Sequence, residues 1–275
     1  MTYDEIQRQY DEVIAPHYDL DPLAVTGRSL DRALAQLKDV GCLLGVLPTM
    51  DVLDVGIGTG RFFGLLRQES DREIRPHGLD VSRQMIELAM TRIPDLIAEV
   101  DDGANIAVHF DGTLFDLVCT HFVTGFVPLA HIAPEIFSKL KPGGYWSFVG
   151  ATSQAFSKLQ EVSHSRLVKL LLGGKGPKLN DLKTPTDQAE VEQLLQSHSL
   201  EICDIQTFLP ELLFRNFDEF MAFAWKGGWL TPFIEDVGIH KASRLIQFAL
   251  NQFVFPVMDH HQIVIALVRK PLIDC

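Results

Sequence analysis

The sequence has few cysteines, and its basic residues are fewer than its acidic ones. Its four cysteines lie far apart in 275 residues, so no CxxC pair is present for zinc or redox chemistry, and no disulfide framework is indicated. Lysine and arginine together number 24 against 36 aspartates and glutamates, which gives a formal net charge of −12. Because phosphate backbones are bound through clustered cations, we expect no nucleic-acid partner.

Long apolar runs are missing as well. No stretch is long and apolar enough to span a bilayer, and residues 1–5 lack the basic start and the apolar run of a secretion signal. We therefore expect a cytoplasmic protein with no membrane partner. The chain length suits one α/β domain with an elaboration, or two unequal lobes.

From residue 50 onward, short apolar runs alternate with segments of helical period. This alternation predicts strands joined by crossover helices in a mostly parallel sheet. Strands are predicted at 50–55, 76–80, 96–100, 115–120, 145–150, 200–208 and 262–268. Helices are predicted at 61–68, 82–92, 133–140 and 186–197, with a glycine-rich loop at 173–177.

A glycine-rich segment, D-V-G-I-G-T-G at 54–60, joins the first predicted strand to the following helix. Small residues at such a turn let the backbone approach a ligand closely. The dinucleotide fingerprint G-x-G-x-x-G fails here, because its last glycine is replaced by Arg61 in one register and by Phe63 in the other. Asp54, two places before the first glycine, has no role in binding phosphate but could pair with a cationic amine.

This segment resembles the first motif of class I S-adenosyl-L-methionine (SAM)-dependent methyltransferases, in which the glycine turn passes beneath the amino-acid part of SAM. Asp80, at the end of the second predicted strand, matches the acidic residue of the family that accepts hydrogen bonds from the ribose hydroxyls. Residues 101–104 resemble the adenine-contacting turn, with Asp102 preferred to Asp101. Segments 115–120 and 140–144 match the fourth strand and the turn before the fifth. The resemblance implies a cofactor site formed by Asp54, Gly56, Gly58, Gly60, Asp80, Asp102, Gly103, Thr120 and Tyr18.

The same resemblance implies a doubly wound, Rossmann-like α/β sheet of seven strands, mostly parallel, with the last strand antiparallel. Two stretches lie outside the sheet pattern and have helical periodicity with many aromatics. We expect a helical N-terminal lid at 1–47 and a helical insertion at 209–259, before the last strand, that covers the acceptor pocket. The SAM-binding domain would then comprise 48–208 and 260–275.

His121, just beyond the fourth strand, is the candidate catalytic residue, as a general base or as a group that orients the acceptor. The alternative is a buried histidine bonded to backbone, or one that only shapes the SAM pocket. Metal-dependent catechol-type enzymes place a carboxylate after the fourth strand, which 119–122 does not offer. We therefore expect no metal.

Aromatic residues crowd the insertion at 209–259 and predict an apolar acceptor chamber, with an ordinary core as the alternative. Arg215, Lys226 and Arg244 are the cations there that could meet an anionic substrate, or they are solvated surface charges. Tyr-Asp pairs in the N-terminal segment indicate either contacts to the cofactor or acceptor, or a helix packed on the sheet. The predicted substrate pocket contains Tyr10, Phe122, Phe220, Trp225, Trp229 and His261.

The predicted function is therefore metal-independent methyl transfer from SAM to oxygen, nitrogen or carbon of a small apolar or carrier-bound molecule. The layout also resembles carboxyl methyltransferases that act on acyl carriers in biotin synthesis, but no motif selects them. Two alternatives stay open, a non-catalytic SAM-binding or regulatory protein and a NAD(P)-dependent oxidoreductase. The sequence does not identify the acceptor, the pathway or the oligomeric state.

Overall fold

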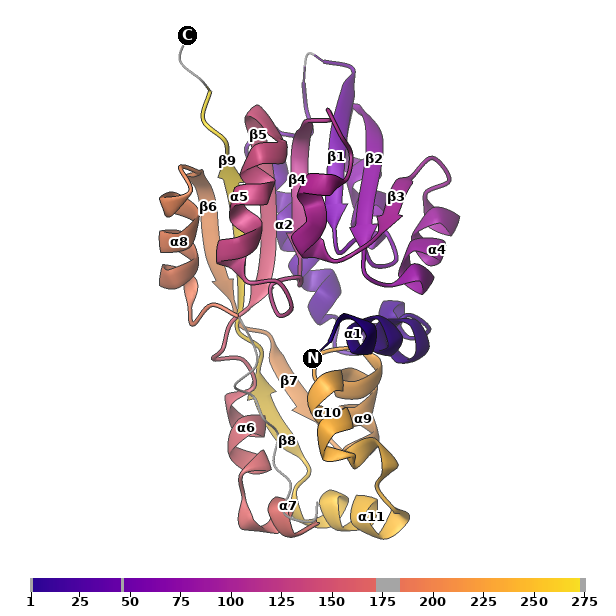
Figure 1. The fold of residues 1–275 in the computed structure, drawn as a ribbon. Coiled ribbons are helices and arrows are strands. Elements are labelled where there is room, and N and C mark those ends of the chain that lie inside the picture. The colour runs from indigo at the N-terminus through magenta and orange to yellow at the C-terminus, as the bar shows by residue number, and fades with distance from the viewer. Residues whose placement is uncertain (1, 46, 172–183, 273–275) are drawn as a thin grey trace.

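A seven-stranded sheet forms the centre of the molecule (Figure 1). A smaller substructure, here called the lid, extends from one end of this sheet. The structure is a computed structural model that describes residues 2–45, 47–171 and 184–272. The glycine-rich loop predicted at 173–177 lies outside the described residues.

The strand order in this sheet is β3-β2-β1-β4-β5-β9-β6. Neighbouring strands are parallel from β3 to β5, whereas β9 runs antiparallel to both β5 and β6, so the predicted doubly wound sheet with an antiparallel last strand is confirmed. All six apolar residues at the start of β9 are buried, as expected for a strand covered on both faces. The strands are β1 (Thr49–Val55), β2 (Glu73–Asp80), β3 (Ile97–Val100), β4 (Phe115–His121), β5 (Leu140–Ala151), β6 (Glu201–Phe208) and β9 (Ile263–Arg269).

Helices cover both faces of the sheet and bury two large apolar cores. The amphipathic helix α2 (Val25–Asp39) packs against β5 and β9, so this part of the N-terminal segment lies on the sheet. It contacts α3 (Arg61–Glu69), which in turn contacts α4 (Arg83–Arg92), while α5 (Leu129–Lys139) contacts α8 (Gln188–Ser197). No helix among the described residues is both long enough and apolar enough to cross a membrane.

The lid is built from two separate insertions, one after β5 and one after β6. The second insertion contains several helices, and it begins and ends with two strands that pair antiparallel, β7 (Glu211–Phe214) and β8 (Val257–His260). The first insertion adds two short helices that the sequence pattern does not indicate. The lid helices are α6 (Ser157–Ser163), α7 (Arg166–Leu171), α9 (Phe217–Met221), α10 (Thr231–Val237) and α11 (Arg244–Phe253).

The lid joins the main sheet through a short neck. Phe208 pairs with Ile263 at the end of the main sheet, and Glu211 pairs with His260 at the start of the lid sheet. Only residues 209–210 and 261–262 separate the two ladders. The backbone N–H of His261 donates to the carbonyl of Pro210 at 3.1 Å, so the pairing continues across the neck.

Residues 3–21, here called the strap, lie between the sheet and the lid (Figure 1). The strap contains α1 (Tyr3–Gln9) and two short turns of π-helix and 3₁₀-helix. Arg8 forms an ion pair with Glu235 of α10 at 2.7 Å, whereas the carboxylate of Asp11 accepts a hydrogen bond from Ser82 Oγ at 2.6 Å. The strap therefore contacts the lid on one side and the sheet domain on the other.

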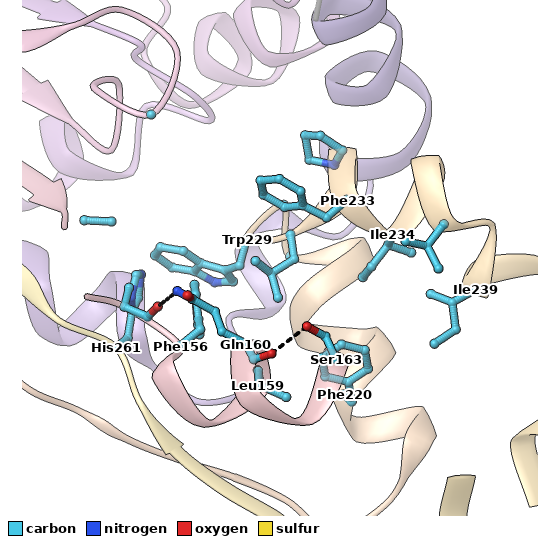
Figure 2. A pocket seen from close by; sticks show the side chains of 18 of the residues that line it. Phe156, Leu159, Gln160, Ser163, Phe220, Trp229, Phe233, Ile234, Ile239 and His261 are labelled. Atoms are coloured by element: carbon cyan, nitrogen blue, oxygen red, sulfur yellow. Dashed lines mark hydrogen bonds between the residues drawn. The ribbon is translucent and has the colours of Figure 1, made fainter. Parts of the chain in front are cut away.

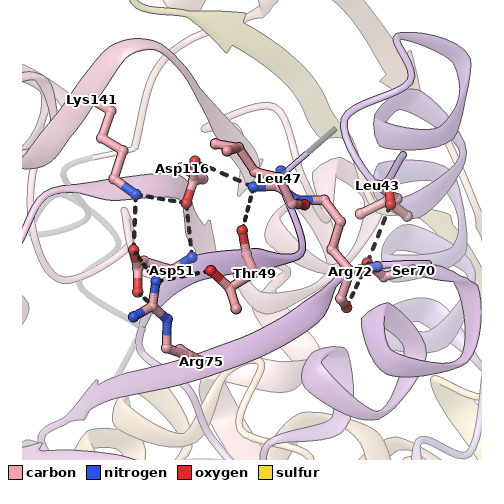
Figure 3. A network of polar contacts seen from close by, with 9 residues as sticks. All are labelled: Leu43, Leu47, Thr49, Asp51, Ser70, Arg72, Arg75, Asp116 and Lys141. Atoms are coloured by element: carbon pink, nitrogen blue, oxygen red, sulfur yellow. Dashed lines mark hydrogen bonds and ion pairs between the residues drawn. The ribbon is translucent and has the colours of Figure 1, made fainter. Parts of the chain in front are cut away.

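An ion-pair network closes the opposite end of the sheet (Figure 3). The ammonium of Lys141 lies 2.8 Å from both Asp51 and Asp116, which come from neighbouring strands. Burial acts to raise the pKa of Asp116, but the hydrogen bond from Lys141 and the nearby Arg72 outweigh it and hold the pKa below its ordinary value. Lys141, in the 140–144 segment of the resemblance, therefore stabilises the fold at this end.

Candidate active site

The glycine turn after β1 depends on backbone conformations that favour glycine. Gly56, Gly58 and Gly60 have φ of +73°, +55° and +73°. A Cβ atom on Gly56 would lie 2.5 Å from Cγ2 of Val123, so a side chain does not fit without movement. The amide of Gly56 donates to the carbonyl of Leu79 at 2.7 Å, which holds the turn against the end of β2.

Asp80 closes β2 directly beside this turn. Its two carboxylate oxygens accept hydrogen bonds from the backbone N–H groups of Gly58 at 2.8 Å and Ser82 at 2.9 Å. The residue is 6% exposed, and burial raises its pKa to about 6 although the backbone hydrogen bonds act to lower it. Each oxygen keeps a second lone pair, so the carboxylate can still accept the hydroxyls of a vicinal diol.

Asp54 lies at the end of β1 and is 3% exposed. Its Oδ1 atom has no hydrogen-bond partner among the described residues. Burial, with a smaller contribution from the charge of Asp80, raises its pKa well above the ordinary value. Because buried polar atoms are almost always paired, this oxygen indicates a donor from outside the chain, and the ammonium of an amino-acid ligand fits that requirement.

The turn after β3 distinguishes the two candidate aspartates for an adenosine. The carboxylate of Asp101 is occupied by hydrogen bonds with His109 at 2.8 Å and Asn105 at 2.9 Å. That of Asp102 accepts the backbone N–H of Ala104 at 2.9 Å and is otherwise free within the described structure. A Cβ on Gly103 would lie 3.2 Å from Val55, so the turn packs closely against β1.

The strap covers the glycine turn from outside. Cε1 of Tyr18 lies 3.5 Å from the position of a Cβ on Gly58. Asp19 accepts hydrogen bonds from Thr59 Oγ1 and from Arg92, both at 2.7 Å. Burial raises the pKa of Tyr18 above its ordinary value, so its phenol is neutral. Tyr18 therefore stands between the turn and the lid.

A cavity of about 440 Å³ opens between the strap, the end of the sheet and the lid (Figure 2). Its size is typical of small-molecule sites, and its lining is mostly aromatic and aliphatic. Trp225, which the sequence places in the substrate pocket, is not part of the lining and stacks on His240, with ring centroids 4.5 Å apart. The other predicted pocket residues line it, together with Tyr18: Tyr10, Phe122, Phe220, Trp229 and His261.

The described lining of this cavity carries no charged side chain. Arg215 pairs with Glu219 at 3.4 Å on the surface, and Lys226 and Arg244 are exposed. These three cations therefore do not meet a ligand in the cavity. Their placement agrees with the alternative that they are solvated surface charges.

Two aromatic residues of the lining have a strained backbone. Phe122 and Phe156 have φ of +63° and +59°, a region that bulky residues rarely adopt. The ring of Phe122 meets Trp229 edge-on at 4.9 Å, and that of Phe156 stacks on His261 at 4.3 Å. Strain of this kind gathers at binding sites, where the surrounding packing maintains it. Phe156 directly precedes α6, a helix that the sequence pattern does not indicate, so the sequence gives no signal for its role.

His121 and Thr120 end β4 but do not line the cavity. The hydroxyl of Thr120 accepts a hydrogen bond from Trp146 at 2.8 Å within the sheet core. His121 is buried, lies 3.0 Å from Ser147 Oγ through Nε2, and meets Phe62 edge-on at 4.4 Å. Burial lowers the pKa of His121 to about 3, so the ring is a neutral, weak base near pH 7. Its catalytic role stays a prediction, as does the binding role of Thr120.

The described residues contain no group of three or more His, Cys, Asp or Glu side chains that could hold a metal ion. Cys42 and Cys119 are buried and reduced, and Cys203 is exposed and free.

Together, the sheet order, the glycine turn after β1 and the acidic residue closing β2 define the class I methyltransferase fold. Residues 52–144 match the family described as a methyltransferase domain. This match supports the resemblance of residues 52–144 to class I SAM-dependent methyltransferases.

Solved structures show the same fold at low sequence identity. The YcgJ protein from Bacillus subtilis is 17% identical with a TM-score of 0.57, over 88% of this chain and 99% of that one. A candidate methyltransferase from Bacillus halodurans is 15% identical with a TM-score of 0.55, over 86% and 98%. A candidate sarcosine dimethylglycine methyltransferase from Galdieria sulphuraria is 12% identical with a TM-score of 0.54, over 98% of both chains. No curated protein matches the sequence.

Proposed function

We propose that the protein is a SAM-dependent methyltransferase that acts on a small, mainly apolar acceptor bound in the lid cavity. The observation that carries the proposal is the buried Oδ1 of Asp54, which has no hydrogen-bond partner in the described parts of the chain and lies beside a glycine turn that leaves no room for side chains. The ammonium of SAM would pair with Asp54, the ribose hydroxyls would bind Asp80, and the adenine would contact the turn at 102–103.

When bound, SAM supplies a methyl group that is already activated on a sulfonium, so the protein mainly positions the acceptor. The apolar cavity orients the acceptor and excludes water, and the strap covers the cofactor side. The two lid insertions and the strap would thus act as the acceptor lid, and the sheet domain would hold the cofactor. Transfer can go to oxygen, nitrogen or carbon, and a carrier-bound acceptor group would enter the same cavity.

His121 remains the proposed base or orienting residue for this reaction. With a pKa of about 3, its imidazole removes a proton poorly near pH 7. Because His121 does not line the cavity, it would orient the acceptor only through neighbouring residues. The variant His121→Gln separates the two roles. Loss of a base would change the pH profile of turnover, whereas loss of orientation would lower turnover equally at every pH.

The proposal is tested by calorimetric titration with SAM and with S-adenosylhomocysteine (SAH), the demethylated product of SAM. Asp54→Asn should weaken SAM binding at least tenfold, because it replaces a charge-assisted pair by a neutral contact. Asp116→Asn is the matched control, since this half-buried carboxylate lies at the other end of the sheet. Failure of the folded wild type to bind either ligand would overturn the proposal.

Turnover is then measured as methyl transfer from labelled SAM to a panel of apolar phenols, acids and amines. Transfer to a member of the panel would support the proposed methyltransferase activity. Tight SAM binding without transfer would favour a non-catalytic SAM-binding protein. Binding of NAD(P) instead of SAM would favour the oxidoreductase alternative.

A further inference from the structure

His261 is a fully buried histidine that has no role in the methyl-transfer chemistry proposed above. It is 0% exposed and lines the lid cavity (Figure 2). Neither ring nitrogen has a hydrogen-bond partner among the described residues. Burial lowers its pKa to about 3, so the ring is neutral and offers one N–H donor and one acceptor nitrogen. Leaving both unpaired in an apolar wall is costly, which indicates that a ligand satisfies at least one of them.

The position of this ring is fixed from several sides. The peptide of His261 lies in the neck, where its N–H donates to Pro210, and the flanking carbonyl of His260 accepts the N–H of Phe156 at 3.0 Å. The ring stacks on Phe156 at 4.3 Å and meets Trp229 edge-on at 4.7 Å. These contacts hold the imidazole before a ligand arrives, which is the arrangement that gives a hydrogen bond directional selectivity.

The charge of the cavity restricts what this histidine can bind. No lysine, arginine, aspartate or glutamate is among the described residues of the lining. A carboxylate, phosphate or ammonium group would lose its hydration there without gaining a counter-ion from the described part of the chain. The remaining polar atoms include the buried hydroxyl of Thr184, which also lacks a partner in the described structure.

We propose that His261 is a positioning and specificity-determining residue that selects an uncharged, mainly apolar acceptor carrying a hydroxyl or carbonyl group, which it holds by a hydrogen bond. This inference rests on the proposed function, because it names the class of acceptor that the methyltransferase takes. A hydroxyl suits the site best, since it can donate to one ring nitrogen or accept from the other.

The test uses three probes with one carbon skeleton: 2-naphthol, 2-methylnaphthalene and 2-naphthoate. Each is titrated by calorimetry into the 275-residue protein saturated with SAH. The wild type should bind 2-naphthol three- to tenfold more tightly than 2-methylnaphthalene, the contribution of one hydrogen bond, and more than tenfold more tightly than 2-naphthoate. His261→Phe keeps the aromatic packing and should remove the preference for the naphthol, with SAH affinity unchanged.

His240→Phe is the matched control, because His240 stacks on Trp225 outside the cavity and the variant should keep the preference. Should His261→Phe fail to fold, nitrogen NMR of the wild-type histidines supplies the answer. 2-Naphthol should then shift the ring nitrogens of His261, and 2-methylnaphthalene should leave them unchanged.

The outcomes separate this inference from the proposed function. If the wild type does not bind SAH, the proposed function fails and the inference fails with it. If SAH binds but His261→Phe keeps the naphthol preference, if 2-naphthoate binds as tightly as 2-naphthol, or if no probe binds, this inference alone is overturned.

Discussion

The affinity for SAM should fall as the pH drops through 6, because Asp80 must be ionised to accept the ribose hydroxyls. Burial raises the pKa of Asp80 to about 6, so about nine-tenths of the unliganded protein is ionised at pH 7 and about one-tenth at pH 5. If only the ionised form binds SAM, the dissociation constant rises about tenfold between these pH values, which is about 1.4 kcal/mol.

The stability of the unliganded protein should change in the opposite direction. The folded pKa of Asp80 lies above the ordinary value for an unfolded chain, so the folded state binds this proton more tightly. The stabilisation is fully present below about pH 4 and is lost as the pH rises through about 6, with a total of about 3 kcal/mol. Asp54, whose pKa is raised in the same direction, adds to this trend.

Calorimetric titrations with SAM at pH 5, 6, 7 and 8 measure the first effect, and urea unfolding of the unliganded protein measures the second. Asp80→Asn, which cannot ionise, should flatten the pH dependence of both SAM affinity and stability. Asp54→Asn measures how much of each pH dependence comes from Asp54. An equal wild-type affinity at pH 5 and pH 7 would refute the reasoning, since it would mean that Asp80 is already ionised at pH 5 or does not contact the ligand.

Three further predictions concern the turn, the network and the lid. Gly56→Ala should lower the free energy of unfolding by about 2–4 kcal/mol, against about 1 kcal/mol for Gly112→Ala, because both have positive φ but only Gly56 is crowded, by Val123. If urea unfolding showed the same loss of unfolding free energy for both variants, the clash with Val123 would be contradicted. Lys141→Met should cost about 1.5–3 kcal/mol and leave SAM affinity unchanged, and a weakened affinity would show that the two ends of the sheet are coupled. Asp259→Ala should cost about 1–2 kcal/mol, because this carboxylate accepts backbone N–H groups at the start of α6, and unchanged hydrogen exchange in α6 would argue against that role.

The glycine turn after β1 and the carboxylate that closes β2 could be predicted from sequence because their signals are local. The glycine turn and Asp80 follow strands that are buried on both faces, and a fixed spacing of small and acidic residues needs no knowledge of distant contacts. The cap of α4 is equally local, since Ser82 accepts the N–H of Met85 at 3.0 Å as its position before the helix predicts. The antiparallel direction of the last strand has no such local signal, and it was predicted only from the resemblance to a family.

The lid could be predicted only in part, because its structure depends on contacts between distant segments. The strands β7 and β8 are four residues each and pair across more than forty positions of chain, so neither shows a clear alternation of its own. Helical spacing also could not tell Trp225 from Trp229, four residues apart, since which one faces the cavity depends on how η5 (Ala222–Lys226) turns.

The short neck makes the lid sheet a stiff continuation of the main sheet. The two ladders are interrupted by only two residues on each strand and remain linked there by a hydrogen bond, so bending at this point would break paired backbone. We therefore expect the lid to keep its position relative to the main sheet. The strap closes the other side of the cavity through ion pairs at the surface, such as Arg8–Glu235 and Arg92–Asp19, and through the buried carboxylate of Asp21, which accepts two backbone N–H groups. For the proposed methyltransferase, we expect the choice of acceptor to follow from the shape of this preformed cavity and the release of product to require movement of the strap.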